Sequence, residues 1–321
     1  MTKEHIPQAV ILPGHEELAE EDVAAFTELL AANHYEVVFR DLSDASYTPD
    51  SRDLLVFFSP MRDLTRDELD KLSAFAGQGG SFLFTRDYTD PVSKMPNYTA
   101  LLRSYGFICL DGIVKADLQE EGTYLDGNPA NLIPEMLSTD ITFDLITSGA
   151  DKVLLPNATA FEMPEEQTDR NLIVGTVLQS SSGSYLKDLS ELKQAISIDE
   201  LLDWMAADNR AEGDASGPFA LALQARRITA EGYVSRAFII GCSPALTNED
   251  SLTIKASEQL IIRTMEFLLD LEMSDLDIME RQAVRASLGV GNLRPGTVLI
   301  VALPAAVLLA ALLVLPRRRR R

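Results

Sequence analysis

The chain ends in a long apolar stretch, Thr297 to Pro316, which carries no charged residue and runs directly into five arginines, Arg317 to Arg321. At about 1.5 Å per residue, a helix of this length spans the hydrocarbon core of a bilayer, which is about 30 Å thick. A buried core helix rarely runs so long without a polar face, and it does not need a terminal basic block. The stretch therefore predicts a transmembrane helix over 297–316 that contacts the lipid bilayer.

The arginines predict how this helix is oriented. Positively charged flanks stay on the cytoplasmic side, so the basic tail 317–321 is expected in the cytoplasm and the preceding domain outside the plasma membrane. Such a placement needs an export signal, and Met1 to Val10 (MTKEHIPQAV) contains no apolar run of the signal-peptide kind. We expect an upstream membrane span to precede this sequence; the alternative is a cytoplasmic domain that breaks the charge rule.

The charge balance restricts the partners of the domain. The chain carries 28 basic and 49 acidic residues, a net charge of −21. Because six basic residues lie at Arg294 and in the tail, residues 1–293 hold 22 basic against 49 acidic side chains, a net charge of −27. A surface so acidic repels phosphate backbones, so no nucleic acid is expected as a partner. Two cysteines, Cys109 and Cys242, are too few for a disulfide framework, and the sequence leaves open whether they pair.

The first 115 residues alternate short apolar runs with amphipathic helical patterns. Leu54 to Phe58 (LLVFF) is the most apolar run and predicts a central strand that is covered on both faces. Thr65 and Glu68 have capping-box spacing, which predicts the start of a helix. The alternation is typical of a doubly wound, mostly parallel α/β sheet of the flavodoxin or glutamine-amidotransferase kind. The predicted strands are 9–12, 35–39, 54–58, 81–85 and 107–110, and the predicted helices are 18–32, 65–77 and 96–105.

Residues 116–293 are expected to continue this α/β domain with irregular insertions and a final packing helix over 251–271. Two segments of the chain resemble each other, LLVFFSPMRDLTRDEL (54–69) and AFIIGCSPALTNEDSL (237–252). Each runs from a strand through Ser-Pro to an acidic helix start, so the same kind of strand-to-helix turn is used twice. Further strands are predicted over 152–155, 172–178, 219–224 and 237–240.

Several segments together carry a family resemblance: a strand ending in Gly14-His15-Glu16, DLTRDELDKLSAFAGQGGSFLF (63–84), PNYTALLRSYGF (96–107), SGSYLKDL (182–189), GPFALAL (217–223) and RAFIIGCSPALTN (236–248). In this order, and with the apolar end, the chain resembles auxiliary proteins of ABC transporters of the GldG, gliding-motility type. The resemblance implies an extracytoplasmic domain, an upstream membrane span, and ABC permease and ATPase subunits as partners. This chain departs from the family at Gly241-Cys242-Ser243, where relatives often have an Asp-rich turn, and at Asp140-Ile141-Thr142, where relatives have a histidine.

Polar residues follow the predicted strands of the first half, and ligands of open α/β sheets bind outside the carboxyl ends of the strands. The sequence thus predicts a ligand or partner crevice at that edge. The alternative is structural, with Gly14 forming a turn while Glu16 and Glu17 favour a helix N-terminus through its dipole. The candidate crevice residues are Gly14, His15, Glu16, Ser59, Asp87, Tyr88 and Asp90.

Few residues of the sequence could serve as catalytic groups. A glutaminase-like hydrolase needs a nucleophile beside a base, for which Cys242 or Ser59 with His15 or His34 are the candidates. No His/Cys cluster has metal-ligand spacing, and neither a GxGxxG motif nor a phosphate-binding Gly-Lys-Ser/Thr loop is present, so no metal or cofactor is expected. We therefore expect a non-catalytic, membrane-anchored accessory subunit of an ABC transport system that binds a partner protein or small ligand. A glutaminase-like α/β hydrolase and a stand-alone membrane-anchored receptor remain the alternatives.

Overall fold

The computed structural model describes residues 8–164, 169–189, 197–252 and 254–270. Its sheet is organised around β3 (Leu54–Phe58), in which all five residues are buried. Successive side chains of a strand point to opposite faces, and β3 accordingly contributes Leu54, Val56 and Phe58 to one core cluster and Leu55 and Phe57 to the other. A strand that is apolar on both faces has to be covered on both, as its sequence predicts.

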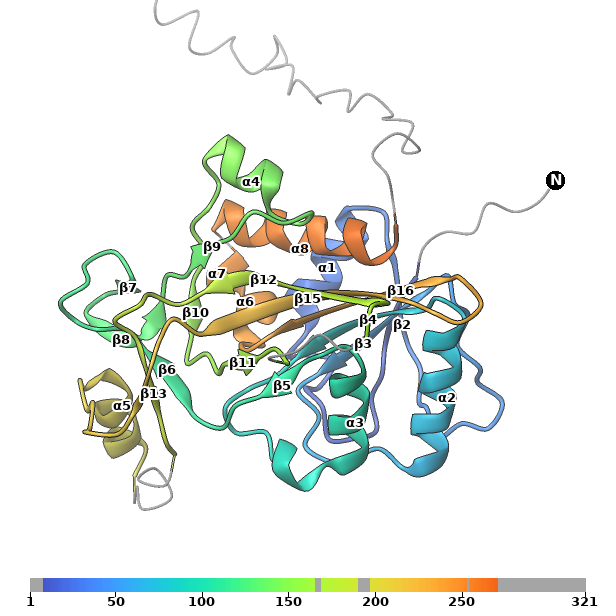
Figure 1. Ribbon diagram of the computed structural model, residues 1–321, viewed down its shortest axis with the longest axis horizontal. Helices are drawn as coiled ribbons and strands as arrows, with labels where there is room; N and C mark the ends of the chain where they lie inside the picture. The colour runs from blue at the N-terminus through green and yellow to red at the C-terminus, as the bar shows by residue number, and fades with distance from the viewer. Residues whose placement is uncertain (1–7, 165–168, 190–196, 253, 271–321) are drawn as a thin grey trace, which may run out of the picture. The chain divides into compact units, whose positions relative to one another are not determined.

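Helices supply that cover. Helices α1 (Ala24–Ala32) and α8 (Lys255–Leu268) pack on one face of the large sheet, and α2 (Arg66–Gly77) and α3 (Pro96–Ser104) pack on the other (Figure 1). Helix α2 begins with the predicted capping box, because Glu68 N donates to Thr65 Oγ1 and Thr65 N donates to the Glu68 carboxylate. The capping-box prediction is confirmed.

The large sheet has ten strands and two kinds of pairing. Five neighbouring strands run parallel in the order β2-β1-β3-β4-β16. The sheet then continues through antiparallel strands in the order β15-β11-β5. Strand β12 also pairs with β15, and β9 pairs with β12. The bounds are β1 Gln8–Ile11, β2 Glu36–Phe39, β4 Ser81–Thr85, β5 Ile108–Cys109, β9 Glu135–Met136, β11 Phe161–Glu162, β12 Leu172–Gln179, β15 Ala220–Ile228 and β16 Val234–Ile240.

The prediction of a doubly wound, mostly parallel sheet was therefore wrong, because the sheet is mixed. The cause is the hairpin of β15 and β16, which pair over their length from Ala222 opposite Ile240 to Ile228 opposite Val234. Its turn is closed by Thr229 N donating to Tyr233 O and contains Gly232 at φ 86. A hairpin makes its two strands antiparallel, and each strand beyond β15 also runs antiparallel to its neighbour.

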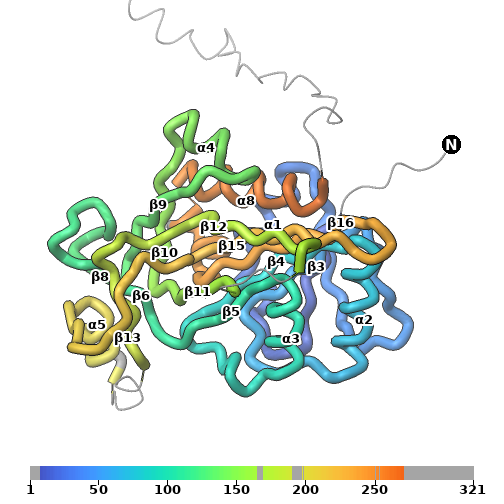
Figure 2. Tube along the Cα trace, viewed as in Figure 1, coloured from blue at the N-terminus to red at the C-terminus, as the bar shows by residue number. Residues whose placement is uncertain are grey.

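The insertions of the second half form two small antiparallel sheets, β10-β8-β7 and β14-β13-β6. Together with α5 they lie to one side of the large sheet, at the left of Figure 2. A buried lysine, Lys115, ties β6 to α5, since its Nζ donates to the Trp204 and Ala207 carbonyl oxygens at 2.7 and 3.1 Å. The bounds are β6 Ile113–Lys115, β7 Tyr124–Leu125, β8 Asn128–Leu132, β10 Leu155–Pro156, β13 Tyr185–Lys187, β14 Ala215–Ser216, α4 Phe143–Ser148, α5 Ile198–Ala206, α6 Pro244–Thr247, α7 Glu249–Leu252 and a 3₁₀ turn, η1, Val92–Lys94.

The predicted packing helix over 251–271 is shorter than expected. The structure has α7 up to Leu252 and α8 from Lys255 to Leu268. Within the described residues, no helix is both long and apolar enough to cross a bilayer. The transmembrane helix predicted over 297–316 and the basic tail 317–321 both lie outside the described residues.

Candidate functional site

Four parallel strands, β1, β3, β4 and β16, end at the same edge of the large sheet, where the sequence predicts the crevice. His15 follows β1, Ser59 follows β3, and Asp87 follows β4. Ser59 adopts a positive φ of 48, which is uncommon for a residue other than glycine and turns the chain sharply after β3. Polar residues therefore lie at this edge of the sheet. Their chemistry depends on the groups that each of them contacts.

Ser59, Thr85 and Ser243 form what we call the hydroxyl cluster. The Ser59 Oγ lies 3.1 Å from Thr85 Oγ1 and 2.5 Å from Ser243 Oγ, and the last two atoms are 2.6 Å apart. All three residues are buried, with at most 4% of their surface exposed. Each hydroxyl can donate one hydrogen bond and accept others, so the three groups satisfy one another without solvent.

His15 lies between two carboxylates in an arrangement that we call the histidine clamp. Its Nδ1 is 3.1 Å from Glu17 Oε1, and its Nε2 is 3.2 Å from Glu68 Oε2. All three side chains are almost fully buried. Burial by itself lowers the pKa of His15, but the hydrogen bonds and charges of Glu17 and Glu68 outweigh it, so the pKa is raised above its ordinary value. The clamp joins the turn after β1 to the first turn of α2.

Asp87 and Asp90 form a turn after β4. Asp90 Oδ2 accepts a hydrogen bond from Asp87 N at 2.9 Å, and Asp87 Oδ1 accepts one from Ser243 N at 2.8 Å. Burial raises the pKa of Asp90 to about 7; the Asp87 N–H opposes this change and the Asp87 charge adds to it. The Asp90 carboxyl group is thus partly protonated near neutral pH.

The other predicted residues are peripheral. Gly14 is exposed at φ 123, and its carbonyl oxygen accepts a hydrogen bond from the Arg62 guanidinium. Glu16 is exposed at φ 61. Tyr88 is half-buried, and burial, followed by the charge of Asp87, raises its pKa. These residues shape the turns of the edge and share no hydrogen bond with the hydroxyl cluster.

The predicted crevice residues thus belong to separate groups of contacts. Ser59 and Asp87 both reach Ser243, whereas His15 is bonded to α2. Sequence reasoning missed Thr85, Ser243, Glu17 and Glu68 as partners. The repeated strand-to-Ser-Pro pattern was the signal for Ser243, since it marks the end of two strands that flank β4. Nothing in the sequence indicated that Glu68 serves the histidine as well as the capping box.

The two cysteines are free thiols. Cys242 is buried, and its Sγ donates to the Pro156 carbonyl oxygen at 3.1 Å. Burial raises the pKa of Cys242 well above the ordinary thiol value and raises that of Cys109 to about 11. Neither thiol has the low pKa of a catalytic nucleophile. In the part of the chain that the structure describes, no group of three or more His, Cys, Asp or Glu side chains is placed to hold a metal ion.

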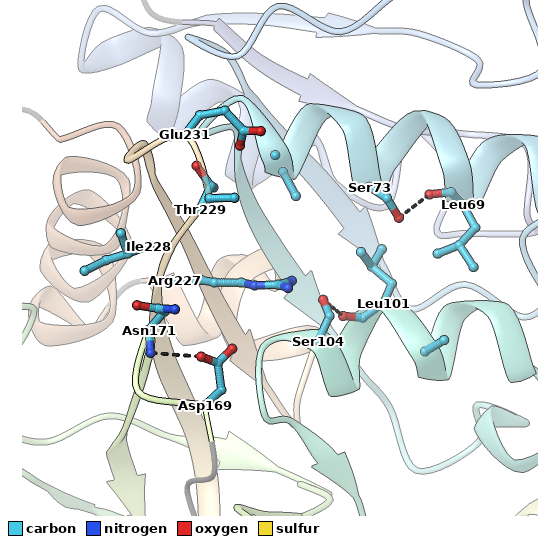
Figure 3. Close-up of a pocket in the computed structure, with 14 residues that line it drawn as sticks. Leu69, Ser73, Leu101, Ser104, Asp169, Asn171, Arg227, Ile228, Thr229 and Glu231 are labelled. Carbon is cyan, nitrogen blue, oxygen red and sulfur yellow. Dashed lines mark hydrogen bonds between the residues drawn. The ribbon is translucent and has the colours of Figure 1, made fainter.

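A cleft of about 530 Å³ lies at the opposite edge of the sheet. Helices α2 and α3 line it on one side, and the end of β15 with the hairpin turn lines it on the other (Figure 3). Arg227 extends from β15 into this space. None of the seven predicted crevice residues lines the cleft.

No protein-family model matches this chain, and no curated protein sequence matches it. Several solved structures match it, among them the following two. The mmIFT52 N-terminal domain has a TM-score of 0.56 at 11% identity, covering 81% of this chain and 97% of its own. The Cytoplasmic Protein STM3548 from Salmonella typhimurium has a TM-score of 0.47 at 12% identity, covering 82% of this chain and 99% of its own. The chain is similar to the mmIFT52 N-terminal domain in fold, and at 11% identity the likeness extends to the fold alone.

Proposed function

We propose that this chain is a non-catalytic, membrane-anchored accessory subunit of an ABC transport system, with an α/β domain that binds a partner protein or small ligand. One observation supports the non-catalytic part most directly: the candidate nucleophiles at the carboxyl edge are buried and occupied by hydrogen bonds within the domain. A hydrolase needs its nucleophile exposed to substrate and within reach of a base.

Each candidate nucleophile departs from that requirement. Ser59 is 4% exposed, and its hydroxyl contacts Thr85 and Ser243 rather than a histidine. Cys242 is buried with a raised pKa, which disfavours the thiolate that attacks a substrate. His15, the histidine at this edge, engages carboxylates with both ring nitrogens. This arrangement stabilises the strand ends and favours the accessory role over the glutaminase-like alternative.

The membrane and transporter parts of the proposal rest on the sequence. Thr297 to Pro316 has the length and apolar character of a transmembrane helix, and Arg317 to Arg321 favour a cytoplasmic end. The resemblance to GldG-type auxiliary proteins indicates an ABC permease and its ATPase as the partners. The domain would then act outside the plasma membrane, and the anchor would dock against the permease.

The proposal is tested by purifying the affinity-tagged full-length chain from its native membranes and identifying the co-purifying proteins by mass spectrometry. We expect an ABC permease and an ATPase to be enriched. The matched control is the variant Leu308→Arg/Leu309→Arg, which places two charges in the apolar stretch that is proposed to dock against the permease and is expected to lose these partners. Recovery of the membrane-bound chain without any permease or ATPase would favour the stand-alone receptor instead.

Sidedness is tested separately by protease protection. Trypsin added to intact spheroplasts should digest the domain, whereas an epitope placed after Arg321 should survive until the membrane is permeabilised. A domain that is protected in intact spheroplasts would place it in the cytoplasm and contradict the proposed orientation.

A further inference from the structure

The cleft between α2, α3 and the β15–β16 hairpin is lined by one arginine, Arg227. Arg227 is half-buried, and within the described residues its guanidinium makes no hydrogen bond or ion pair. Two other arginines of the same hairpin are paired: Arg226 pairs with Asp140 at 3.1 Å, and Arg236 pairs with Asp270 at 2.5 Å. In Figure 3 the Arg227 side chain crosses the cleft towards Ser104 of α3. A guanidinium offers five N–H donors in a planar fork that matches a carboxylate.

Spare hydrogen-bonding groups lie beside Arg227. The Asn171 side-chain amide has no hydrogen-bond partner in the described part of the chain. Thr229 Oγ1 accepts a hydrogen bond from Tyr233 N, which leaves its own proton available. Ser104 Oγ donates to the Leu101 carbonyl oxygen and keeps its lone pairs. The cleft can therefore satisfy several polar atoms of a ligand in addition to one charge.

The rim of the cleft is negative. Asp169 and Glu231 are both exposed and lie on opposite sides of Arg227 in the view of Figure 3. Gly77 and Ser104, the last residues of α2 and α3, also line the cleft, and the C-terminal end of a helix carries a partial negative charge. A dianion such as phosphate is disfavoured here, because one arginine faces two carboxylates and two helix C-termini. A ligand that carries a positive group next to its carboxylate fits this charge pattern.

The walls are partly apolar, and the volume suits a small molecule. Leu69, Ala76, Ala100 and Leu101 supply aliphatic surface from the two helices, and Ile228 supplies it from the end of β15. Small-molecule sites are typically apolar clefts of about 300 to 1,000 Å³ with a few placed polar groups. The cleft of about 530 Å³ falls within that range.

We propose that this cleft binds a zwitterionic amino carboxylate with an apolar side chain, the size of an amino acid or dipeptide. The ligand carboxylate pairs with Arg227, its ammonium group pairs with one of the two rim carboxylates, Asp169 or Glu231, and its apolar part packs on Leu69 and Leu101. The inference does not depend on the accessory role, because it stands on the charges and shape of the cleft alone.

Isothermal titration calorimetry of the full-length protein in detergent micelles at pH 7 tests this site, with L-leucine and L-leucyl-L-leucine as probes. We expect saturable binding of at least one of them. Two single-charge analogues, 4-methylpentanoate and 3-methylbutylamine, should bind at least about tenfold more weakly, because each lacks one of the two charged contacts. Inorganic phosphate should not bind.

Matched variants test which residues contact the charged groups of the ligand. Arg227→Gln should weaken leucine-type binding by about tenfold or more, whereas Arg103→Gln, which removes an exposed arginine of α3 outside the cleft lining, should leave it unchanged. Asp169→Asn/Glu231→Gln alters only exposed side chains, so the fold is preserved. This double variant should weaken binding of leucine but not that of 4-methylpentanoate.

Three results would overturn the proposal. The first is the absence of saturable binding by either zwitterion up to about 10 mM. The second is binding of 4-methylpentanoate or phosphate that is as tight as that of the zwitterions. The third is leucine binding that survives both Arg227→Gln and the double variant. None of these results bears on co-purification with a permease, so the site and the accessory role can fail independently.

Discussion

Ser59 and Ser243 are 184 residues apart in the sequence, and their hydroxyl oxygens lie 2.5 Å apart. Each serine follows a strand and precedes a proline, Pro60 in one case and Pro244 in the other. Their strands β3 and β16 flank β4, whose last residue Thr85 contacts both serines. The two Ser-Pro turns thus converge on the end of the strand between them and join the early and late parts of the chain.

The first prediction concerns this convergence. Ser243→Ala leaves the buried hydroxyls of Ser59 and Thr85 with one partner fewer, so we expect the free energy of unfolding to fall by about 1 to 3 kcal/mol. Urea denaturation followed by circular dichroism measures the change. Ser182→Ala is the control, since Ser182 is exposed, and it should change stability by less than about 0.5 kcal/mol.

A double-mutant cycle sharpens this prediction. Because Ser59 and Ser243 share one hydrogen bond, the variant Ser59→Ala/Ser243→Ala should lose less stability than the sum of the two single variants, with a coupling of about 0.5 kcal/mol or more. Additive losses would mean that the two hydroxyls do not act on each other.

The central strands of the parallel half could be predicted from the sequence because they are runs of mostly apolar residues. Leu54–Phe58 and Ser81–Thr85 have the predicted bounds, since strands buried on both faces stand out as continuous apolar runs. The antiparallel half could not be predicted in the same way. β15 carries Gln224, Arg226 and Arg227 along its length, so the apolar run 219–224 shows only its first part.

The candidate site could also be predicted only in part from the sequence. That polar residues gather at the carboxyl edge follows from parallel topology, and the prediction placed His15, Ser59 and Asp87 there. Their partners, however, come from turns and helices whose three-dimensional proximity has no sequence period. Glu68 follows the capping-box pattern, and nothing in that pattern shows that its carboxylate also faces His15 across the end of β1.

The second prediction concerns the histidine clamp and pH. The pKa of folded His15 is raised above the ordinary value of 6.5, so its protonated form stabilises the fold below that pH, and this contribution is lost as the pH rises through the folded value. His15→Gln should therefore cost about 2 to 4 kcal/mol near pH 6 and clearly less at higher pH. The free energy of unfolding, measured at several pH values in urea, gives this difference.

The control for the clamp is His34→Gln, because His34 is exposed. This variant should follow the wild-type stability profile at every pH. A cost of His15→Gln that does not change with pH would show that the ring acts through packing and not through its charge.

The third prediction concerns Asp90, whose pKa is raised by burial to about 7. Since the folded state binds this proton more tightly than the unfolded state does, stability falls as the pH rises from about 4 to 7. Asp90→Asn keeps an oxygen that accepts from Asp87 N and removes the buried charge, so it should stabilise the fold by about 2 to 4 kcal/mol at pH 8 and little at pH 4. Denaturant titrations at both pH values measure the gain, and exposed Asp126→Asn should show none.

The fourth prediction tests how closely β16 approaches the segment before β11. A Cβ at Gly241 would lie 2.2 Å from the Thr159 carbonyl oxygen, which is a backbone atom held by the Thr159 N–H···O bond to Gly241. Gly241→Ala should therefore destabilise the fold by roughly 3 kcal/mol or more, because the two backbones have to separate. Gly77→Ala is the matched control: no atom lies within 4 Å of its Cβ position, so stability should stay the same or rise by up to about 1 kcal/mol. Thermal unfolding of both variants compares them, and equal melting temperatures would contradict the close approach.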